Sequence, residues 1–189
     1  MTCTLAHLNP YLSNDKADSA LIRLYGRAAL GVQKNRYLRL LKEAEQRLSG
    51  SRYLLASAPG RTELGGNHTD HNNGRVLASA VDLDCVAAVA PNRDNRVVLY
   101  SGDYPEPISV DLSTLNPEPG ERGSPEALIR GIGSARNRRG SSIQGFKAMV
   151  DSTCKPGTGL SSSAAFAVLI GGIFASLEKE SLDPVQLAR

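Results

Sequence analysis

The sequence predicts a single domain of the α/β or α+β class. Segments with the alternating apolar pattern of strands are interleaved with segments whose apolar residues recur every three or four positions, as in helices. No low-complexity linker separates these segments, and no internal repeat occurs. A chain of 189 residues is long enough to bury one sizeable core.

The first half of the chain is expected to contain two helices followed by three strands. Residues 1–16 are polar and are expected to be irregular. Apolar residues at helical spacing predict a helix over 21–25, ended by Gly26, and a second over 37–48, ended by Gly50. Alternation of apolar and polar residues predicts strands at residues 53–56, 82–90 and 97–100.

The second half is expected to contain two more strands and two more helices. Residues 101–125 are rich in proline and glycine and are expected to form loops around a strand at 108–112. Helical spacing places 125–136 on a helix, and 146–152 has the pattern of a strand. Residues 164–177 are apolar on nearly all sides, which predicts a buried helix.

The composition excludes several classes of protein. A net charge of +3 is too small to indicate binding to nucleic acid or to an acidic membrane surface. Cys3, Cys85 and Cys154 are far apart and form neither a disulfide framework nor a zinc cluster. No apolar run reaches the roughly 20 residues of a membrane span, and the N-terminus lacks the pattern of a signal peptide. We therefore expect a protein of the reducing cytoplasm that does not bind a membrane.

The last residues contain the start signal of a further helix. Asp183 is a favourable N-cap and Pro184 suits the first helical position, yet the sequence continues only to Arg189. A helix this short is marginally stable unless it is packed. We expect a truncated chain, the alternative being an ordinary frayed terminus.

The segment Lys155-Pro156-Gly157-Thr158-Gly159-Leu160-Ser161-Ser162-Ser163-Ala164-Ala165 lies between an expected strand and the buried helix. Its glycines allow a tight turn and a close approach to a ligand, and the helix N-terminus offers unpaired N–H groups to a phosphate. One of the three serine hydroxyls can ligate Mg²⁺. The alternative is a turn with a single serine N-cap, which does not require two glycines and three serines together. The pattern favours phosphate binding.

This segment differs from the common nucleotide and nucleophile motifs. The sequence contains no G-x-x-x-x-G-K-[ST] phosphate loop, and Ser162 stands where a dinucleotide fingerprint requires its third glycine. It also contains no G-x-S-x-G, so the serines do not form a nucleophile elbow.

A second polar segment covers residues 58–74 and includes Arg61, His68 and Asp70. It contains too many glycines for a regular strand or helix, so we expect a loop that presents polar groups to a hydroxyl-rich ligand. An arginine beside a transferred phosphoryl group can stabilise the charge that develops there. Taken together, the two segments suggest a sugar or alcohol site next to a nucleotide site.

Two alternatives for the second segment remain open. The spacing His68-x-x-His71 with Asp70 suits a metal ion, but His7 is the only other histidine and no third ligand has an obvious spacing. Asp70 and Asn72 can also simply bond to their own backbone in a polar turn.

The two segments resemble signature motifs of the GHMP small-molecule kinases, and specifically of the galactokinase family. The galactokinase pattern G-R-x-N-L-I-G-E-H-T-D-Y-N-x-G is similar to Gly60-Arg61-Thr62-Glu63-Leu64-Gly65-Gly66-Asn67-His68-Thr69-Asp70-His71-Asn72-Asn73-Gly74. The pattern P-x-G-x-G-L-S-S-S-A is present from Pro156 without a break in spacing. Both motifs are long and occur in the family order, and the resemblance covers residues 20–189.

The resemblance implies an α+β fold. It is the N-terminal domain of a GHMP kinase over residues 1–189, with the left-handed βαβ arrangement of a ribosomal protein domain, a mixed sheet and packed helices. The sugar loop would be 58–74 and the phosphate loop 155–164. The implied reaction is phosphoryl transfer from MgATP to a sugar hydroxyl, converting galactose to galactose 1-phosphate.

The resemblance also implies roles for individual residues. Arg61 would be catalytic, near the transferred phosphoryl group, and Ser163 would ligate Mg²⁺. The sugar would be held by Asn67, His68, Thr69 and Asp70. The nucleotide would be bound by Gly157, Thr158, Gly159, Leu160, Ser161, Ser162, Ser163 and Ser101.

The sequence departs from the family pattern at several positions. Asn67 replaces a glutamate, which removes a charged acceptor from the sugar site and leaves the identity of the sugar open. Glu63 replaces an asparagine, Gly65 an isoleucine and His71 a tyrosine. Glu63 is interpreted as a surface residue or as one that supports the site from behind. The alternative is that its carboxylate takes the place of the missing family glutamate from a different position. The family's general base, a second Mg²⁺ ligand and a third glycine-rich motif would follow the helix that begins at Asp183, in a C-terminal half that is missing.

Two functions therefore remain under consideration. The first is a galactokinase-like sugar kinase of which this chain is the N-terminal part, inactive as a fragment. The second is a regulator or sensor that binds the sugar and ATP without catalysis. Nucleic-acid binding is a third, less favoured function. It would use the arginines near the end of the 125–136 helix, which are Arg130, Arg136, Arg138 and Arg139. We expect these arginines to lie on a solvated face instead, where their charge suits the negative end of the helix dipole.

Overall fold

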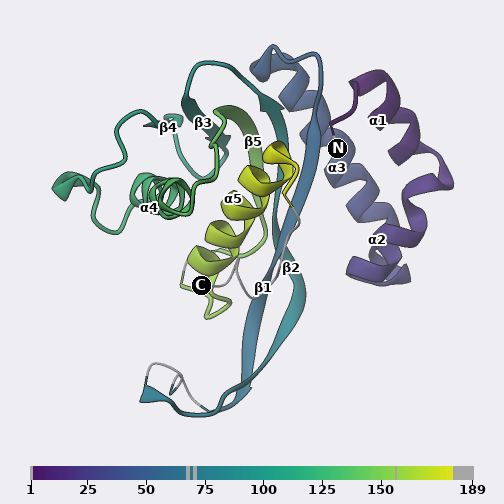
Figure 1. Cartoon of the computed structure of the whole chain (residues 1–189). Coiled ribbons are helices and arrows are strands. Elements are labelled where there is room, and N and C mark those ends of the chain that lie inside the picture. Colours follow the sequence, from purple (N-terminus) through teal and green to yellow (C-terminus); the bar gives the residue numbers. More distant parts are fainter. Residues whose placement is uncertain (1, 67–68, 70–71, 156, 181–189) are drawn as a thin grey trace.

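The computed structural model describes residues 2–66, 69, 72–155 and 157–180 of the chain, which form helices packed on a mixed sheet (Figure 1). The helices are α1 (Leu5–Ser13), α2 (Asp18–Tyr25), α3 (Leu30–Leu48), α4 (Pro125–Arg138) and α5 (Ser162–Glu178). Short 3₁₀ turns lie at Asp15–Ala17, Arg27–Ala29 and Pro119–Glu121. The strands are β1 (Leu54–Gly65), β2 (Leu77–Pro91), β3 (Arg96–Ser101), β4 (Ile108–Asp111) and β5 (Phe146–Ser152).

The five strands form one sheet in the order β1-β2-β5-β3-β4. β1 pairs antiparallel with β2, β2 with β5, and β3 with β4, whereas β3 and β5 run parallel. A parallel pair requires a crossover, which β4 and α4 supply. The predicted α+β class with a mixed sheet is confirmed.

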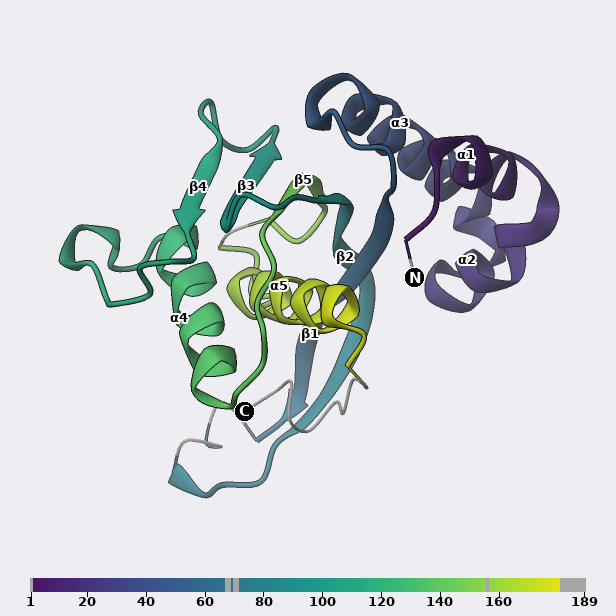
Figure 2. The same ribbon diagram turned by 45° about the horizontal axis from the view of Figure 1, so that its top comes forward.

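Helices cover both faces of the sheet: α4 and α5 lie on one face, and α1, α2 and α3 lie on the other (Figures 1 and 2). β2 shows why both faces are apolar, because its alternate residues serve two cores. Cys85, Ala87 and Val89 pack with α5, while Val86 and Ala88 pack with α3.

Within the described residues, the predicted helices and the five strands are present, but one helix was missed and several elements begin or end elsewhere than predicted; α3, for example, begins at Leu30 rather than at residue 37. Residues 1–16 contain α1, in which Leu5, Leu8 and Leu12 lie at helical spacing and pack in the core beneath α3. Polar neighbours and Pro10, within the same helix, obscured this short apolar stripe in the sequence. β2 begins at Leu77 rather than residue 82 because its first part pairs with the extension of β1.

The expected loop at 58–74 is also wrong in its first part, because β1 continues to Gly65. Shifts of register between Pro59 and Arg61, and between Glu63 and Gly65, allow the strand to continue through the glycine-rich sequence. The far end of the β1–β2 hairpin projects beyond the helices (Figure 1). Leu64 there is 65% exposed.

A buried polar cluster joins the helical layer to the strands that lead to the phosphate loop. Asp84 on β2 is 2% exposed and receives hydrogen bonds from Tyr25, from Ser57 Oγ at 2.5 Å and from Arg36 Nη1 at 2.6 Å. Arg36 also donates from Nε to Asp151 Oδ2 at 3.0 Å. Because each of these charges is paired and hydrogen-bonded, their mutual attraction offsets much of the desolvation penalty of burying them.

Two of the arginines expected on a solvated face are instead held in ion pairs. The Arg130 side chain is 7% exposed and lies 2.6 Å from Glu121 Oε1, while Arg136 is 15% exposed and lies 2.5 Å from Glu178 Oε2. The prediction was wrong for these two because the helical pattern alone could not show acidic partners outside the helix, nine residues before Arg130 and 42 residues after Arg136. Arg138 and Arg139 are exposed, as predicted.

In the part of the chain that the structure describes, no helix is both long enough and apolar enough to cross a membrane.

Candidate functional site

Arg61 on β1 brings the two sequence motifs together. Its backbone N–H donates to the carbonyl oxygen of Leu160 at 3.1 Å, and its Nε donates to Oγ of Ser161 at 3.1 Å. Both acceptors belong to the predicted phosphate loop. Side-chain and backbone contacts therefore join the polar segment to a loop that lies about a hundred positions away in the sequence.

Gly60, immediately before Arg61, lies close to the same loop. A Cβ atom at this position would lie 2.6 Å from Cys154 Sγ and 3.0 Å from the carbonyl oxygen of Leu160. Real Cβ atoms essentially never show a contact as short as 2.6 Å, and one of 3.0 Å is unusually tight. Only glycine therefore permits this approach of β1 to the phosphate loop.

The phosphate loop has the backbone conformation that its glycines predict. Gly157 and Gly159 have φ values of +79° and +75°, in the left-handed region that favours glycine. Ser161 also lies in this region, with a φ of +55°, and α5 begins at the next residue. These angles turn the chain sharply into the N-terminus of a 17-residue helix.

The alternative of a simple serine N-cap is wrong for Ser161. This residue occupies the N-cap position, but its side chain makes no cap hydrogen bond and accepts instead from Arg61. Helix N-termini carry N–H groups without intrahelical partners and the positive end of the dipole. The start of α5 therefore has the character of an anion site.

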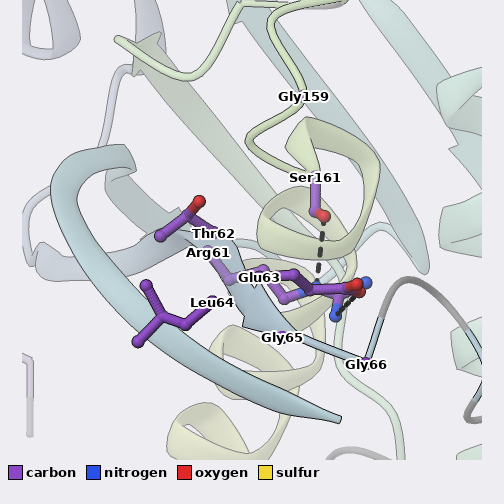
Figure 3. A pocket seen from close by; sticks show the side chains of 8 residues that line it. All are labelled: Arg61, Thr62, Glu63, Leu64, Gly65, Gly66, Gly159 and Ser161. Carbon is purple, nitrogen blue, oxygen red and sulfur yellow. Dashed lines mark hydrogen bonds and ion pairs between the residues drawn. The ribbon is translucent and has the colours of Figure 1, made fainter.

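A cavity of about 360 Å³ lies beside Arg61 (Figure 3). Arg61 and Glu63 project from the same face of β1, and Nη1 of Arg61 lies 3.2 Å from Oε1 of Glu63. The Glu63 side chain is 13% exposed and that of Arg61 is 40% exposed. The complete lining is Arg61, Thr62, Glu63, Leu64, Gly65, Gly66, Gly159 and Ser161. The walls thus come from both motifs.

A second cavity, of about 310 Å³, lies between the end of β3, the start of α4 and the start of α5. Its walls include apolar residues, among them Leu99 and Phe166, as well as polar residues. Ser101, Ser162 and Ser163 all line it. The structure therefore brings Ser101, predicted near the nucleotide, together with the serines of the phosphate loop.

An ion pair lies beside this second cavity. Lys155 Nζ is 2.6 Å from Asp103 Oδ1, which connects the phosphate loop to the turn after β3. Asp103 lines the cavity, although no sequence motif marks it. Glu63 was likewise interpreted as a surface or supporting residue, but it lines the first cavity. The strand alternation of residues 61 and 63 was the signal that could have placed it there.

The predicted sugar-binding residues are described only in part. Asn67, His68 and Asp70 lie outside the described residues, as does the expected helix at 183–189. Thr69 donates from Oγ1 to the carbonyl oxygen of Gly66 at 2.7 Å. Its own carbonyl oxygen accepts from the N–H of Gly74 at 2.8 Å.

Two buried thiols lie against the second cavity without nucleophilic character. Burial raises the pKa of Cys85 from 9.0 to about 12, and it also raises the pKa of Cys154. Both thiols therefore stay neutral at ordinary pH, and a thiol is a poor nucleophile compared with a thiolate.

Among the described residues, no group of three or more His, Cys, Asp or Glu side chains is arranged to hold a metal ion. The donors at the start of α5 suit a different arrangement, in which Mg²⁺ is shared with phosphate oxygens. Ser163 is exposed at the first turn of the helix and lines the second cavity. Its hydroxyl fits the predicted role of a Mg²⁺ ligand.

The chain has recognisable similarity to known protein families. The galactokinase galactose-binding signature matches residues 45–91, and the N-terminal domain of the GHMP kinases matches residues 127–189. The mevalonate kinase of Methanococcus jannaschii, which is 18% identical, has a TM-score of 0.59 over 71% of this chain and 43% of that chain. The fold is that of a GHMP kinase N-terminal domain.

Within this class, the chain is similar to the N-terminal part of galactokinases. Galactokinase from Lacticaseibacillus casei (strain BL23) is 33% identical over 133 residues, which are 70% of this chain and 34% of that protein. The structure of Lactococcus lactis galactokinase complexed with galactose has a TM-score of 0.70 and 26% identity, covering 78% of this chain and 38% of that chain. The chain thus spans about a third of the length of the curated relatives it matches.

Proposed function

We propose that this chain is the N-terminal part of a sugar kinase that transfers the terminal phosphoryl group of MgATP to a hydroxyl of galactose. The bond between Arg61 and Ser161 carries the proposal, because it joins the sugar motif to the phosphate loop at one point. Phosphoryl transfer depends mainly on positioning the two substrates and on stabilising charge. A site that holds the sugar motif against the phosphate loop supports this chemistry.

The two cavities suggest how the substrates divide between them. The second cavity combines apolar walls with polar groups and leads to the serines of α5, which suits a nucleoside with its phosphates at the helix N-terminus. The first cavity has polar side chains on β1 and suits the sugar. Ser163 would hold Mg²⁺ together with the phosphates, and the metal would neutralise part of their charge.

Arg61 lies between these two regions. Its guanidinium carries five N–H donors in a planar fork, and it never loses its charge at ordinary pH. Nε and Nη1 already bond to Ser161 and Glu63, which fixes the plane of the group. We infer that the remaining donors stabilise the charge on the transferred phosphoryl group.

The residue that removes the proton from the sugar hydroxyl is expected in the part of the relatives that this chain does not span. We propose that this C-terminal portion completes the site, together with a further glycine-rich motif. Galactose binding, ATP binding and turnover should therefore be measured separately, for the full-length protein and for residues 1–189.

The expected result is that the full-length protein forms galactose 1-phosphate, whereas residues 1–189 alone do not turn over. Robust turnover by residues 1–189 would contradict the placement of the base in the C-terminal portion. Binding of both ligands by the full-length protein without product would favour the sensor, which the replacement of glutamate by Asn67 makes a reasonable second candidate. Failure to bind either ligand would exclude both functions.

A further inference from the structure

The chain turns back immediately after β3, and this turn forms part of the wall of the second cavity. The N–H of Tyr104 donates to the carbonyl oxygen of Ser101 at 3.2 Å, which closes the turn. The N–H of Asp103 donates to Oγ of Ser101 at 3.3 Å. Ser101, Asp103 and Tyr104 all line the cavity. The turn therefore presents its side chains to the cavity from a defined backbone conformation.

The residues that line this cavity differ in burial. Leu99 and Ile108 are 1% and 4% exposed, whereas the side chain of Asp103 is 37% exposed. A buried apolar wall suits a nucleobase, and the serines at the start of α5 suit the phosphates. The ribose of a nucleotide joins its base to its phosphates, so it must meet the part of the wall that lies between them.

Asp103 is joined to the phosphate loop by an ion pair. Lys155, the first residue of that loop, places its Nζ 2.6 Å from Oδ1 of Asp103. Among the described residues, no other group donates to the Asp103 carboxylate. An ionised carboxylate has two oxygens and about four lone-pair sites, so it can accept further hydrogen bonds. The ion pair thus holds a strong acceptor in the cavity wall, next to the phosphate loop.

The charge of this pair suits a ribose. A lone carboxylate would repel the phosphates at the start of α5, but the ammonium of Lys155 offsets its charge. Ribose hydroxyls donate hydrogen bonds, and a charged acceptor binds them more strongly than a neutral one does. Acidic side chains hold ribose hydroxyls in this way in dinucleotide-binding folds. Asp103 therefore combines the position and the chemistry that a ribose requires.

We propose that Asp103 is a specificity-determining residue whose carboxylate accepts a hydrogen bond from a ribose hydroxyl of the nucleotide. The site then prefers ATP to the deoxynucleotide that lacks this hydroxyl. The proposal rests on the proposed function, since it requires that the second cavity bind the nucleoside. Lys155 holds the carboxylate in place and does not itself contact the ribose.

Calorimetry on the full-length protein tests the proposal, with the magnesium complexes of ATP, 2′-deoxyATP and 3′-deoxyATP titrated separately. Asp103→Asn keeps the shape of the side chain but removes its charge, whereas Lys155→Gln removes the ion pair but leaves the carboxylate. Asp94→Asn is the matched control, because Asp94 is exposed in the turn before β3, at the other end of this strand. Thermal unfolding without nucleotide verifies that each variant remains folded.

We expect the wild type to bind ATP at least about tenfold more tightly than one of the two deoxynucleotides, because a charge-assisted hydrogen bond is lost. Asp103→Asn should bind ATP and that deoxynucleotide with affinities within about threefold, since both changes remove the same contact. The ratio of the two affinities is the informative quantity, because a change of charge near the phosphates affects both nucleotides alike. Asp94→Asn should keep the wild-type ratio.

Lys155→Gln separates recognition of the ribose from support of the turn. It should still prefer ATP to the same deoxynucleotide, while all three nucleotides bind more weakly. If it loses the preference as completely as Asp103→Asn does, Asp103 acts only by joining the turn to the loop, and the proposal is overturned. Retention of the full preference by Asp103→Asn would overturn it as well.

The wild-type protein alone separates this proposal from the proposed function. Equal binding of all three nucleotides would overturn the role of Asp103 and leave the kinase proposal intact. If the wild type binds no MgATP, the proposed function and the role of Asp103 both fail.

Discussion

Nε of Arg61 and Oγ of Ser161 form a 3.1 Å hydrogen bond between β1 and the residue that precedes α5. The contact is possible because Ser161, with a φ of +55°, does not use its hydroxyl to cap the helix. An arginine of the sugar motif and a serine of the phosphate loop thus act as one structural unit. The first predictions concern this unit.

Substitution of Arg61 by alanine should lower kcat of the full-length kinase by about a hundredfold or more, with a smaller change in KM. An interaction made mainly in the transition state affects kcat in this way. Steady-state kinetics with galactose and ATP measures both constants. Arg138→Ala, which removes an exposed arginine from the end of α4, is the control. An effect confined to KM would make Arg61 a binding residue instead.

Ser161→Ala should also reduce kcat, by about tenfold, because Arg61 loses the acceptor that fixes its Nε. The double variant Arg61→Ala/Ser161→Ala should be little worse than Arg61→Ala alone, since residues that act as a unit are not additive. Additive losses would show that Ser161 acts independently of Arg61. Ser113→Ala is a suitable comparison, because the exposed Ser113 hydroxyl donates to Oδ1 of Asp111 at 2.6 Å and lines neither cavity.

Gly60→Ala should destabilise the protein by about 1–3 kcal/mol, because the added Cβ overpacks the contact with Cys154 and Leu160. Gly65→Ala in the same strand is the matched control, as a Cβ there meets nothing within 4 Å. Urea unfolding measures both changes. A second substitution, Cys154→Ala, should restore part of the stability that Gly60→Ala loses, because it removes the Sγ atom that lies 2.6 Å from the added Cβ. If stability is not restored, the close contact with the backbone of Leu160 accounts for the loss.

The sequence predicted most elements of the fold because their apolar periodicity was local. The helix over 164–177 was apolar on nearly all sides, and most of α5 is packed in the core on the sheet, although Ala164 and Val168 are exposed. The alternation of 82–90 likewise identified the core part of β2. The glycines at 157 and 159 predicted a tight turn, and both residues have positive φ values in the structure.

Features that depend on contacts between different elements could not be predicted. β1 continues to Gly65 because β2 pairs with it across two shifts of register. The glycine content of the segment alone therefore wrongly predicted a loop. Arg130 is buried because Glu121 and Glu118 come from a preceding turn. The place of Glu63 beside Arg61 depends in the same way on the strand that the glycines concealed.

Arg36→Met should destabilise the protein by about 3–5 kcal/mol, because it leaves the buried carboxylate of Asp84 without its cationic partner. Arg39→Met is the matched control: Arg39 also lies beside Asp151, at 3.2 Å, but its side chain is 66% exposed. An exposed ion pair contributes about 1 kcal/mol or less. Urea unfolding measures the stability of both variants. If they lose the same free energy of unfolding, the buried ion pair of Arg36 stabilises the protein no more than an exposed one does.

Stability should decrease as the pH rises above about 9, because the Cys85 thiol has a pKa of about 12 in the folded protein instead of 9.0. Between these values the unfolded chain loses a proton that the folded chain keeps. The unfolded state then binds fewer protons, and the free energy of unfolding falls by at most about 1.4 kcal/mol per pH unit for this group.

Cys85→Ala tests this directly, by urea unfolding between pH 8 and about 10, below the range in which buried tyrosines contribute strongly. Burial also raises the pKa of Tyr25 and Tyr37, so their effect adds to the slope only at higher pH. The variant should be less stable than the wild type at pH 8, because a buried side chain is shortened. Between pH 8 and about 10 it should then lose less stability than the wild type does, because it lacks the thiol that titrates. An identical slope in both proteins would mean that Cys85 already ionises in the folded state.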